Sequence, residues 1–274
     1  MPELPEVETV RRSLLDELVG RTITRVELAN PKFARYPDPA ELEAALPGQT
    51  ITGLSRRGKY LIIQLGDELD LVIHLKMAGR LLISDPAAER VRHTHIILGL
   101  DNGHELRYVD LRHFGGFYLV ARGDYRVLKG LYGLGPEPLR PGFTASYLKQ
   151  CFASRKSKIK NLLLDQSVIA GLGNIYADEA LYRSGISPLR EAGSLGDREI
   201  ERLHRVIEEV IAEAIEHRGT TFATYVDGQG RRGRFAERLQ AYGRQGEPCL
   251  ACGRPLVRVK IGGRSAHYCP DCQR

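Results

Sequence analysis

Four cysteines near the end of the chain constrain its fold more than any other feature. They are spaced Cys249-x2-Cys252 and Cys269-x2-Cys272, with sixteen residues between the pairs, which is the spacing of a four-thiolate zinc ribbon. The segment around them has little apolar periodicity, so a hydrophobic core cannot hold it. We therefore predict one structural Zn²⁺, because four thiolates leave no open position for a substrate. A disulfide pair is the alternative, which a reducing cytoplasm disfavours. We expect the fifth cysteine, Cys151, to be a buried, inert thiol.

The same terminal segment is strongly basic. Residues 231–274 contain ten Lys and Arg against three acidic residues, whereas the whole chain has a net charge of only +6. A basic excess confined to one segment is typical of a surface that binds a polyanion, because each neutralised phosphate releases counterions. A solvated basic tail is the alternative interpretation.

The first half of the chain is predicted to be mainly β. Residues 6–19 place apolar side chains on one helical face and are followed by Gly20. Short β-rich runs then occur at 22–28, 60–65, 71–75, 95–100 and 117–120. Asp101-Asn102-Gly103 lies between two such runs and is a strong hairpin signal. Strands at this spacing predict a β-sandwich with the first helix packed beside it.

The second half is predicted to be helical. A Pro- and Gly-rich linker at 133–143 precedes helical patterns at 157–169, 175–183 and 200–214. The predicted fold class is α+β, with an N-terminal sandwich domain (2–132), a helical domain (144–240) and a zinc-ribbon finger (241–274). No run approaches the roughly 18 apolar residues of a membrane span, and acidic residues follow Met1 where a signal peptide would carry basic ones. We therefore expect a cytoplasmic protein with no membrane partner.

The N-terminus carries a candidate catalytic group. Met1 precedes Pro2 and Glu3, and a small second residue is the condition under which the initiator Met is normally removed. Removal exposes a secondary amine whose pKa, near 8, leaves a usable neutral fraction at physiological pH. Attack of this amine on a sugar C1′ would form an iminium ion, and a carboxylate beside it is placed for general acid-base work. The alternative is that Pro2 and Glu3 simply begin a helix.

A second short motif is compatible with anion binding. Gly171-Leu-Gly-Asn174-Ile-Tyr lies between two helical patterns and places Asn174 as the predicted N-cap of the second. Backbone N–H groups at a helix start can hold an anion, and Lys156, Lys158 and Lys160 lie just upstream. An ordinary interhelical turn is the alternative.

Taken together, these motifs resemble those of the formamidopyrimidine-DNA glycosylase family along the whole chain. The resemblance rests on Pro2-Glu-Leu-Pro-Glu-Val-Glu8, Arg56-Arg-Gly-Lys59, His74-Leu-Lys-Met77, Asp110-Leu-Arg-His-Phe-Gly115, Gly171-Leu-Gly-Asn-Ile-Tyr176 and the four cysteines. It implies a β-sandwich, a helix-two-turn-helix module around Asn174 and a zinc-held hairpin, with DNA between the halves. It implies a monomer that excises oxidised purines from double-stranded DNA, also acts on abasic sites, and works in the bacterial cytoplasm at the nucleoid.

The resemblance also implies roles for individual residues. Pro2 is the Schiff-base nucleophile, Glu3 the proton donor for base loss, Lys59 a proton donor in β-elimination, and Arg264 a catalytic phosphate-holding residue. The implied DNA contacts are His74, His93, Arg112, Lys160, Asn174 and Arg264. The residues that fill the space of the extruded nucleotide are Met77, Arg112 and Phe114. A loop at 219–235 closes over the extruded base, with Thr224 and Tyr225 as contacts.

The sequence departs from the family pattern at two places, and two alternative functions stay open. Ala78 stands where some relatives carry a glutamate that faces the lesion, and Arg231 and Arg232 make the closing loop unusually basic. The first alternative is the related endonuclease VIII group, which prefers oxidised pyrimidines and usually has Gly where this chain has Leu4. The second is a zinc-ribbon DNA-binding protein without catalysis, which has no use for a free proline amine.

Overall fold

The computed structural model describes residues 1–274, and the chain divides into two compact units. The first comprises Met1–Tyr132 and His217–Arg234, and the second comprises Gly133–Glu216 and Phe235–Arg274. The segment 217–234 thus belongs to the first unit, although the sequence led us to place it in the helical domain. Its contacts with the first helix, described below, are the reason. No helix is long and apolar enough to cross a membrane.

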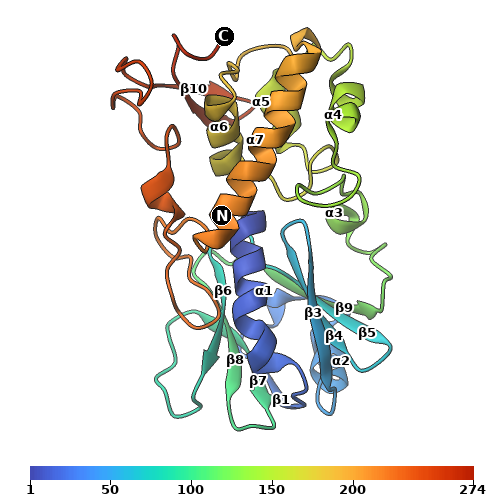
Figure 1. Ribbon diagram of the computed structural model, residues 1–274. Helices are drawn as coiled ribbons and strands as arrows, with labels where there is room; N and C mark the ends of the chain where they lie inside the picture. The colour runs from blue at the N-terminus through green and yellow to red at the C-terminus, as the bar shows by residue number, and fades with distance from the viewer. The chain divides into compact units, whose positions relative to one another are not determined.

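The first unit is a sandwich of two β-sheets flanked by helices (Figure 1). Its sheets have strand orders β1-β7-β8-β6 and β2-β9-β5-β4-β3. The strands are β1 (Ile23–Leu28), β2 (Ala34–Tyr36), β3 (Ile51–Arg57), β4 (Tyr60–Leu65), β5 (Leu69–His74), β6 (Gly79–Ser84), β7 (Thr94–Leu100), β8 (Glu105–Asp110) and β9 (Gly116–Ala121). The helices are α1 (Leu4–Leu18), α2 (Pro39–Ala45), α3 (Lys129–Tyr132) and the short 3-10 turn η1 (Pro31–Phe33).

One hydrophobic core holds this unit together. Apolar side chains of both sheets meet in it, and α1 contributes Val7, Val10, Leu14 and Leu18, all fully buried. These four positions recur at helical spacing, so one face of α1 packs on the sheets. The predicted β-sandwich and the predicted hairpin between β7 and β8 are both confirmed.

The second unit is helical and ends in a two-stranded hairpin. Its helices are α4 (Ala145–Phe152), α5 (Ile159–Leu164), α6 (Asn174–Arg183) and α7 (Asp197–Glu216), with 3-10 turns η2 (Ala192–Ser194) and η3 (Phe235–Arg238). The hairpin pairs β10 (Val257–Ile261) with β11 (Arg264–Tyr268). The finger around it has a small core of Tyr182, Ala241, Cys249, Leu256 and Cys269. That core is too small to hold the segment by apolar burial alone, as the sequence predicted.

Candidate functional site

The start of α1 is a buried acidic corner. Pro2 is buried, and Glu3 exposes only 2% of its surface. The Glu3 backbone N–H donates to Glu6 Oε2 at 2.8 Å. This bond provides an acceptor for one of the backbone N–H groups that have no partner within the helix at its start. Met1 is 44% exposed, so it is accessible for removal. The chain therefore presents Pro2 and Glu3 together at the end of a helix that is anchored in the sandwich core.

Glu6 connects this corner to the segment 217–234. Its Oε1 accepts a hydrogen bond of 2.7 Å from the Thr220 backbone N–H. Tyr225 donates its hydroxyl to the Glu6 carbonyl at 3.3 Å and to the Arg218 carbonyl at 3.1 Å. Sequence reasoning assigned no role to Glu6, although an acid three residues after a helix start is a capping signal. The fully buried Glu6 carboxylate holds the candidate closing loop beside Pro2 and Glu3.

The two residues predicted to contact an extruded base differ in accessibility. Thr224 is half-buried, whereas Tyr225 is 8% exposed and belongs to the sandwich core. Burial and the nearby Glu6 raise the pKa of Tyr225, whose hydroxyl is held by backbone carbonyls. The base contact implied for Tyr225 stays a prediction, and in this structure its hydroxyl is bound to protein carbonyls. Phe222, which sequence reasoning missed, is the large apolar side chain that this segment exposes.

Lys59 lies in the tight turn between β3 and β4. The preceding Gly58 has a φ of +55°, and the Arg56 guanidinium donates to the Gly58 carbonyl at 2.8 Å. Arg56 also pairs with Glu8 of α1 at 3.2 Å. Only 7% of Lys59 is exposed, so its ammonium is held by the fold and does not extend into solvent. These contacts fix the turn that carries Lys59 against α1.

His74 lies close to Lys59, and its side chain is buried. It pairs in register with Tyr60, and its Nδ1 accepts the Lys76 backbone N–H at 2.9 Å. Burial, Lys76 and Lys59 lower its pKa to about 3. His74 is thus buried and neutral at physiological pH. The DNA contact implied for His74 stays a prediction, and the hydrogen bond to Lys76 shows that the ring is also held by the loop that follows β5.

The structure brings the predicted space-filling residues together. Strands β6 and β8 pair Gly79 with Asp110, so the loop that carries Met77 lies beside the loop that carries Arg112 and Phe114. Met77 and Phe114 are 39% and 52% exposed, and the Arg112 guanidinium lies 5.6 Å from the centre of the Phe114 ring. Neither apolar side chain is therefore a core residue.

Asp110 fixes the loop of Arg112 and Phe114. Its buried carboxylate accepts the backbone N–H groups of Arg112, Phe114 and Gly115 at 2.9 to 3.0 Å, and the Tyr108 hydroxyl at 3.1 Å. The loop therefore keeps its shape while exposing its side chains. His93, half-buried, is tied to the same place because its carbonyl accepts the Asp110 N–H at 3.1 Å.

In the second unit, Lys160 is not a surface residue. Its side chain is fully buried, and its ammonium donates to Asp178 Oδ1 and to the Ser265 carbonyl, each at 2.5 Å. The ammonium is enclosed between α5, α6 and β11, where its partners are protein groups, and the DNA contact implied for Lys160 stays a prediction. Asp178 Oδ2 also accepts from the His267 backbone N–H at 2.9 Å and lies 3.0 Å from its Nδ1. This Lys160–Asp178–His267 network fastens the hairpin to the helices.

Asn174 and Arg264 lie near each other on that framework. The helix α6 begins at Asn174 with Gly173 as its N-cap, one residue earlier than predicted. The Asn174 amide donates to Ser265 Oγ at 3.3 Å, and its Oδ1 is buried without a partner. Arg264 is exposed directly after the Gly262-Gly263 turn, whose glycines have φ values of +54° and +81°. The hairpin thus presents an arginine beside the start of a helix.

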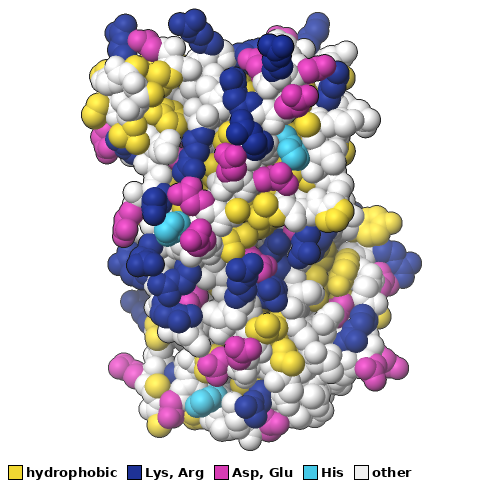
Figure 2. Space-filling view, in the orientation of Figure 1, with side chains coloured by type: hydrophobic (Ala, Val, Ile, Leu, Met, Phe, Trp, Pro, Cys, Tyr) yellow, Lys and Arg dark blue, Asp and Glu magenta, His cyan; other side chains and the backbone are white.

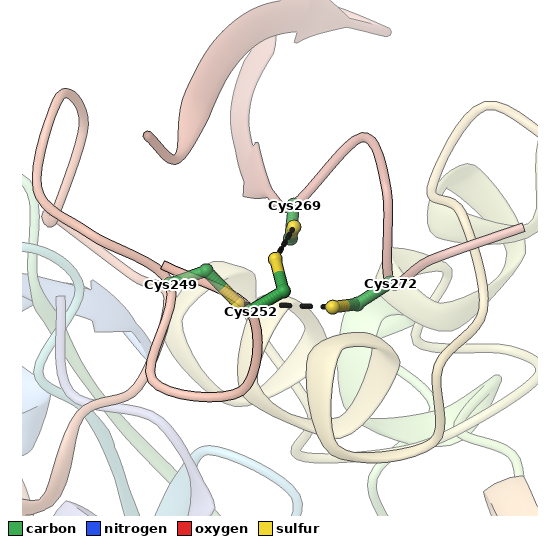
Figure 3. Close-up of side chains that lie close together, drawn as sticks. All are labelled: Cys249, Cys252, Cys269 and Cys272. Atoms are coloured by element: carbon green, nitrogen blue, oxygen red, sulfur yellow. Dashed lines mark hydrogen bonds between the residues drawn. The ribbon is translucent and has the colours of Figure 1, made fainter. Parts of the chain in front are cut away.

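The four cysteine sulfurs have the geometry of a tetrahedral metal site. They lie within 4.8 Å of one another, with 3.9 Å between Cys249 and Cys272 and 3.5 Å between Cys252 and Cys269 (Figure 3). Zn–S bonds near 2.3 Å require about 3.8 Å between sulfurs, whereas a disulfide requires about 2 Å. The residues fit Zn²⁺. Cys151, by contrast, is half-buried, so the predicted full burial is not found.

Lys and Arg side chains are spread over the molecular face in Figure 2, with fewer acidic groups between them. The fold and the site thus define a class of protein: it has two units, a zinc finger suited to binding nucleic acid, and a buried acidic corner at the N-terminus.

Comparison with known families identifies the protein further. Residues 1–117 match the formamidopyrimidine-DNA glycosylase N-terminal domain, 134–226 its H2TH domain, and 246–274 the zinc finger found in that family and in isoleucyl-tRNA synthetases.

Whole-chain relatives agree with these matches. Formamidopyrimidine-DNA glycosylase of Symbiobacterium thermophilum is 51% identical, covering all of this chain and 89% of that protein. The protein of that name from Pelotomaculum thermopropionicum is 48% identical over 100% and 99% of the two chains. The Lactococcus lactis Fpg in complex with abasic-site DNA superposes with a TM-score of 0.93 at 38% identity, covering 99% of each chain. The chain belongs to the formamidopyrimidine-DNA glycosylase family.

Proposed function

We propose that this protein is a base-excision repair DNA glycosylase that removes oxidised purines, 8-oxoguanine and formamidopyrimidines, from double-stranded DNA and then cleaves the strand as an AP lyase. The observation that carries the proposal is the burial of Pro2 and Glu3 together at the start of α1, in a chain that matches this family along its whole length. A protein that only bound DNA would have no use for a secondary amine at this place.

The nucleophile is the amine of Pro2 after removal of Met1. Its lone pair forms a bond to C1′, the bond from C1′ to the base breaks, and the base leaves with a proton from the Glu3 carboxyl. The proline nitrogen then loses its proton, and the bond from C1′ to the ring oxygen O4′ breaks as O4′ takes up a proton, which opens the sugar and leaves an iminium ion between Pro2 and C1′. This iminium ion acidifies the 2′ hydrogens. Loss of one of them expels the 3′ phosphate, which is β-elimination, and a second elimination expels the 5′ phosphate.

Lys59 and Arg264 serve these elimination steps. Lys59 is held in a tight turn with little exposure, so its ammonium meets the sugar-phosphate with little loss of side-chain entropy. Arg264 is exposed at a hairpin tip, and a guanidinium binds phosphate oxygens in a bidentate manner. Lys59 donates a proton in β-elimination, and Arg264 holds the flanking phosphates and assists the departure of the second.

DNA is held and opened by a second set of residues. His93, Arg112, Asn174 and Arg264 contact the phosphate backbone. Met77, Arg112 and Phe114 fill the gap left when the nucleotide is extruded, which costs a few kcal/mol of stacking. The exposure of Met77 and Phe114, the latter on the loop fixed by Asp110, supports this assignment. Thr224 and Phe222 of the segment 217–234 are the side chains available to cover the extruded base.

The zinc ion has a structural role. Four thiolates, Cys249, Cys252, Cys269 and Cys272, complete a tetrahedral shell, so the ion has no open position for a substrate. It supplies the folding energy that the five-residue core of the finger lacks. The enzyme would act as a monomer on DNA that contains oxidised bases or abasic sites, in the bacterial cytoplasm at the nucleoid.

Oxidised pyrimidines are a second candidate substrate class. The wild-type Lactococcus lactis Fpg, 38% identical to this chain, has been crystallised with DNA that contains an oxidised pyrimidine. An enzyme that accepts both oxidised purines and oxidised pyrimidines would distinguish them by the rate at which it excises each base. Excision measured on matched duplexes that carry 8-oxoguanine or an oxidised pyrimidine decides between them, and a faster purine reaction is expected.

Glu3→Gln tests the proposed division of labour. The variant should slow excision of 8-oxoguanine by about 10²- to 10⁴-fold, because base loss then lacks its proton donor. Cleavage of a pre-formed abasic site should change much less, because the Pro2 amine survives. Glu43→Gln, on the exposed face of α2, is the control and should leave both rates unchanged. An equal loss on both substrates would refute the assignment of Glu3 to base release.

A further inference from the structure

Three histidines form a cluster in the first unit that the proposed chemistry does not use as a unit. One ring nitrogen from each of His93, His95 and His113 lies within 4.8 Å of the other two. The ring centres of His95 and His113 are 4.6 Å apart, and that of His93 is 5.8 Å from His113. His93 and His95 lie at the start of β7, and His113 lies on the loop between β8 and β9.

His95 is prepared as a ligand. Its Nε2 lies 2.9 Å from the Asp110 carbonyl oxygen, which can only accept, so the proton is on Nε2 and the lone pair is on Nδ1. Metal-binding histidines typically donate their other ring N–H to such a carbonyl, which fixes ring orientation. Phe33 stacks on the His95 ring with centres 4.3 Å apart and an interplanar angle of 22°. The buried member of the cluster is therefore held in one tautomer and one orientation.

The backbone also holds the other two imidazoles in place. His93 and His113 have φ values of +68° and +57°, a region that non-glycine residues enter only when their surroundings enforce it. The Asp110 N–H donates to the His93 carbonyl, and the Asp110 carboxylate binds the N–H groups on both sides of His113. One aspartate thus sets the positions of all three histidines.

The three imidazole nitrogens need to move only a short distance to bind a metal ion. Ligand nitrogens at 2.0–2.1 Å from a tetrahedral ion lie about 3.4 Å apart, so nitrogens that lie within 4.8 Å of one another must approach by at most about 1.4 Å. His113 is exposed and His93 is half-buried, so rotation of these two side chains closes that gap without moving His95. Three imidazoles suit Zn²⁺, Ni²⁺ and Cu²⁺ and do not suit Mg²⁺ or Ca²⁺.

We propose that His93, His95 and His113 bind one divalent transition-metal ion, separately from the zinc of the four cysteines. Three protein ligands leave a fourth position for water. One of its ligands, His113, lies on the loop of Arg112 and Phe114, so an occupied site draws His113 inward and ties this loop to the start of β7.

Isothermal titration of the zinc-loaded protein with Ni²⁺ tests this proposal, with zinc content measured before and after. One further equivalent should bind at micromolar concentration while one zinc per chain is retained. His113→Gln should weaken this binding at least about tenfold, and it is an exposed position where folding is not at risk. His104→Gln, an exposed histidine in the β7–β8 turn, is the control and should bind Ni²⁺ normally. Failure to bind Ni²⁺, displacement of zinc in equal amount, or equal affinity in wild type and His113→Gln would overturn the proposal.

Discussion

Asp178→Ala should loosen the hairpin that presents Arg264. The Asp178 carboxylate accepts from the Lys160 ammonium, at 2.5 Å, and from the His267 backbone N–H, at 2.9 Å. Both partners of the Lys160–Asp178 pair are fully buried. Removal of the carboxylate leaves a buried ammonium without its counter-charge and a backbone N–H without its acceptor.

The magnitude follows from that burial. Breaking a buried ion pair by removing one partner typically costs 3–5 kcal/mol, because an uncompensated charge remains. Each 1.4 kcal/mol is a factor of ten in the folding equilibrium, so the second unit should lose roughly two to four powers of ten. Lys149 and Asp197 of the same unit form a Lys–Asp pair at 2.7 Å with side chains 59% and 64% exposed. Asp197→Ala should cost less than about 1 kcal/mol.

Urea denaturation followed by far-ultraviolet circular dichroism, with zinc present, measures both losses. Hydrogen exchange at the His267 amide should accelerate in Asp178→Ala and not in Asp197→Ala. The double variant Lys160→Met/Asp178→Leu should recover much of the lost stability, because no buried charge is then left alone. Equal, small losses in Asp178→Ala and Asp197→Ala would refute the reasoning.

Three further predictions address zinc, the closing segment and pH. Cys269→Ser should release zinc and abolish DNA binding, whereas hydrogen exchange in β4 and β5 should not change, because the metal folds the finger only; full affinity without zinc would contradict this. Gly219→Ala should slow excision by about 10- to 100-fold, because a Cβ there would lie 2.6 Å from Glu6 Oε1 at a φ of +73°. Gly230→Ala, with a φ of +79° and no atom within 4 Å of its Cβ, should excise normally. The folded pKa of His74, about 3, lies below its unfolded value of 6.5, so the unfolded state binds more protons and stability falls as pH drops from 6.5 towards 3. Below pH 6, the free energy of unfolding should fall with decreasing pH more steeply in the wild type than in His74→Gln, by about 1.4 kcal/mol per pH unit. Identical slopes in the two proteins would contradict the lowered pKa of His74.

Local patterns in the sequence predicted much of this fold. The Asp101-Asn102-Gly103 turn, the strand at Tyr60–Leu65 and the cysteine cluster all have short-range signals, and each lies where it was expected. The strand β2 has only three residues, and β3 mixes apolar with polar side chains. Such strands are recognisable only from the neighbours with which they pair, so sequence periodicity did not identify them.

Two of the predicted site residues, Lys160 and Tyr225, are buried for the same physical reason. The sequence alone suggests an exposed cation at Lys160 and an exposed aromatic side chain at Tyr225. Each side chain is instead buried against a partner that is distant in the sequence. Lys160 meets Asp178 of another helix, and Tyr225 meets Glu6, 219 positions away. No local pattern shows that a distant partner will satisfy a buried polar group. Conversely, Met77 and Phe114 are apolar like core residues, yet both are exposed, Phe114 on the loop that Asp110 fixes.

Borohydride trapping on an 8-oxoguanine duplex decides whether Pro2 is the nucleophile, because borohydride reduces the iminium ion to a stable amine whose attachment point can be mapped. We expect one covalent protein–DNA adduct, located at Pro2, and no adduct when Met1 is retained, because the proline nitrogen is then part of a peptide bond. An adduct that forms equally well with Met1 retained, or that maps to Lys59, would show that a lysine is the nucleophile and would contradict the account.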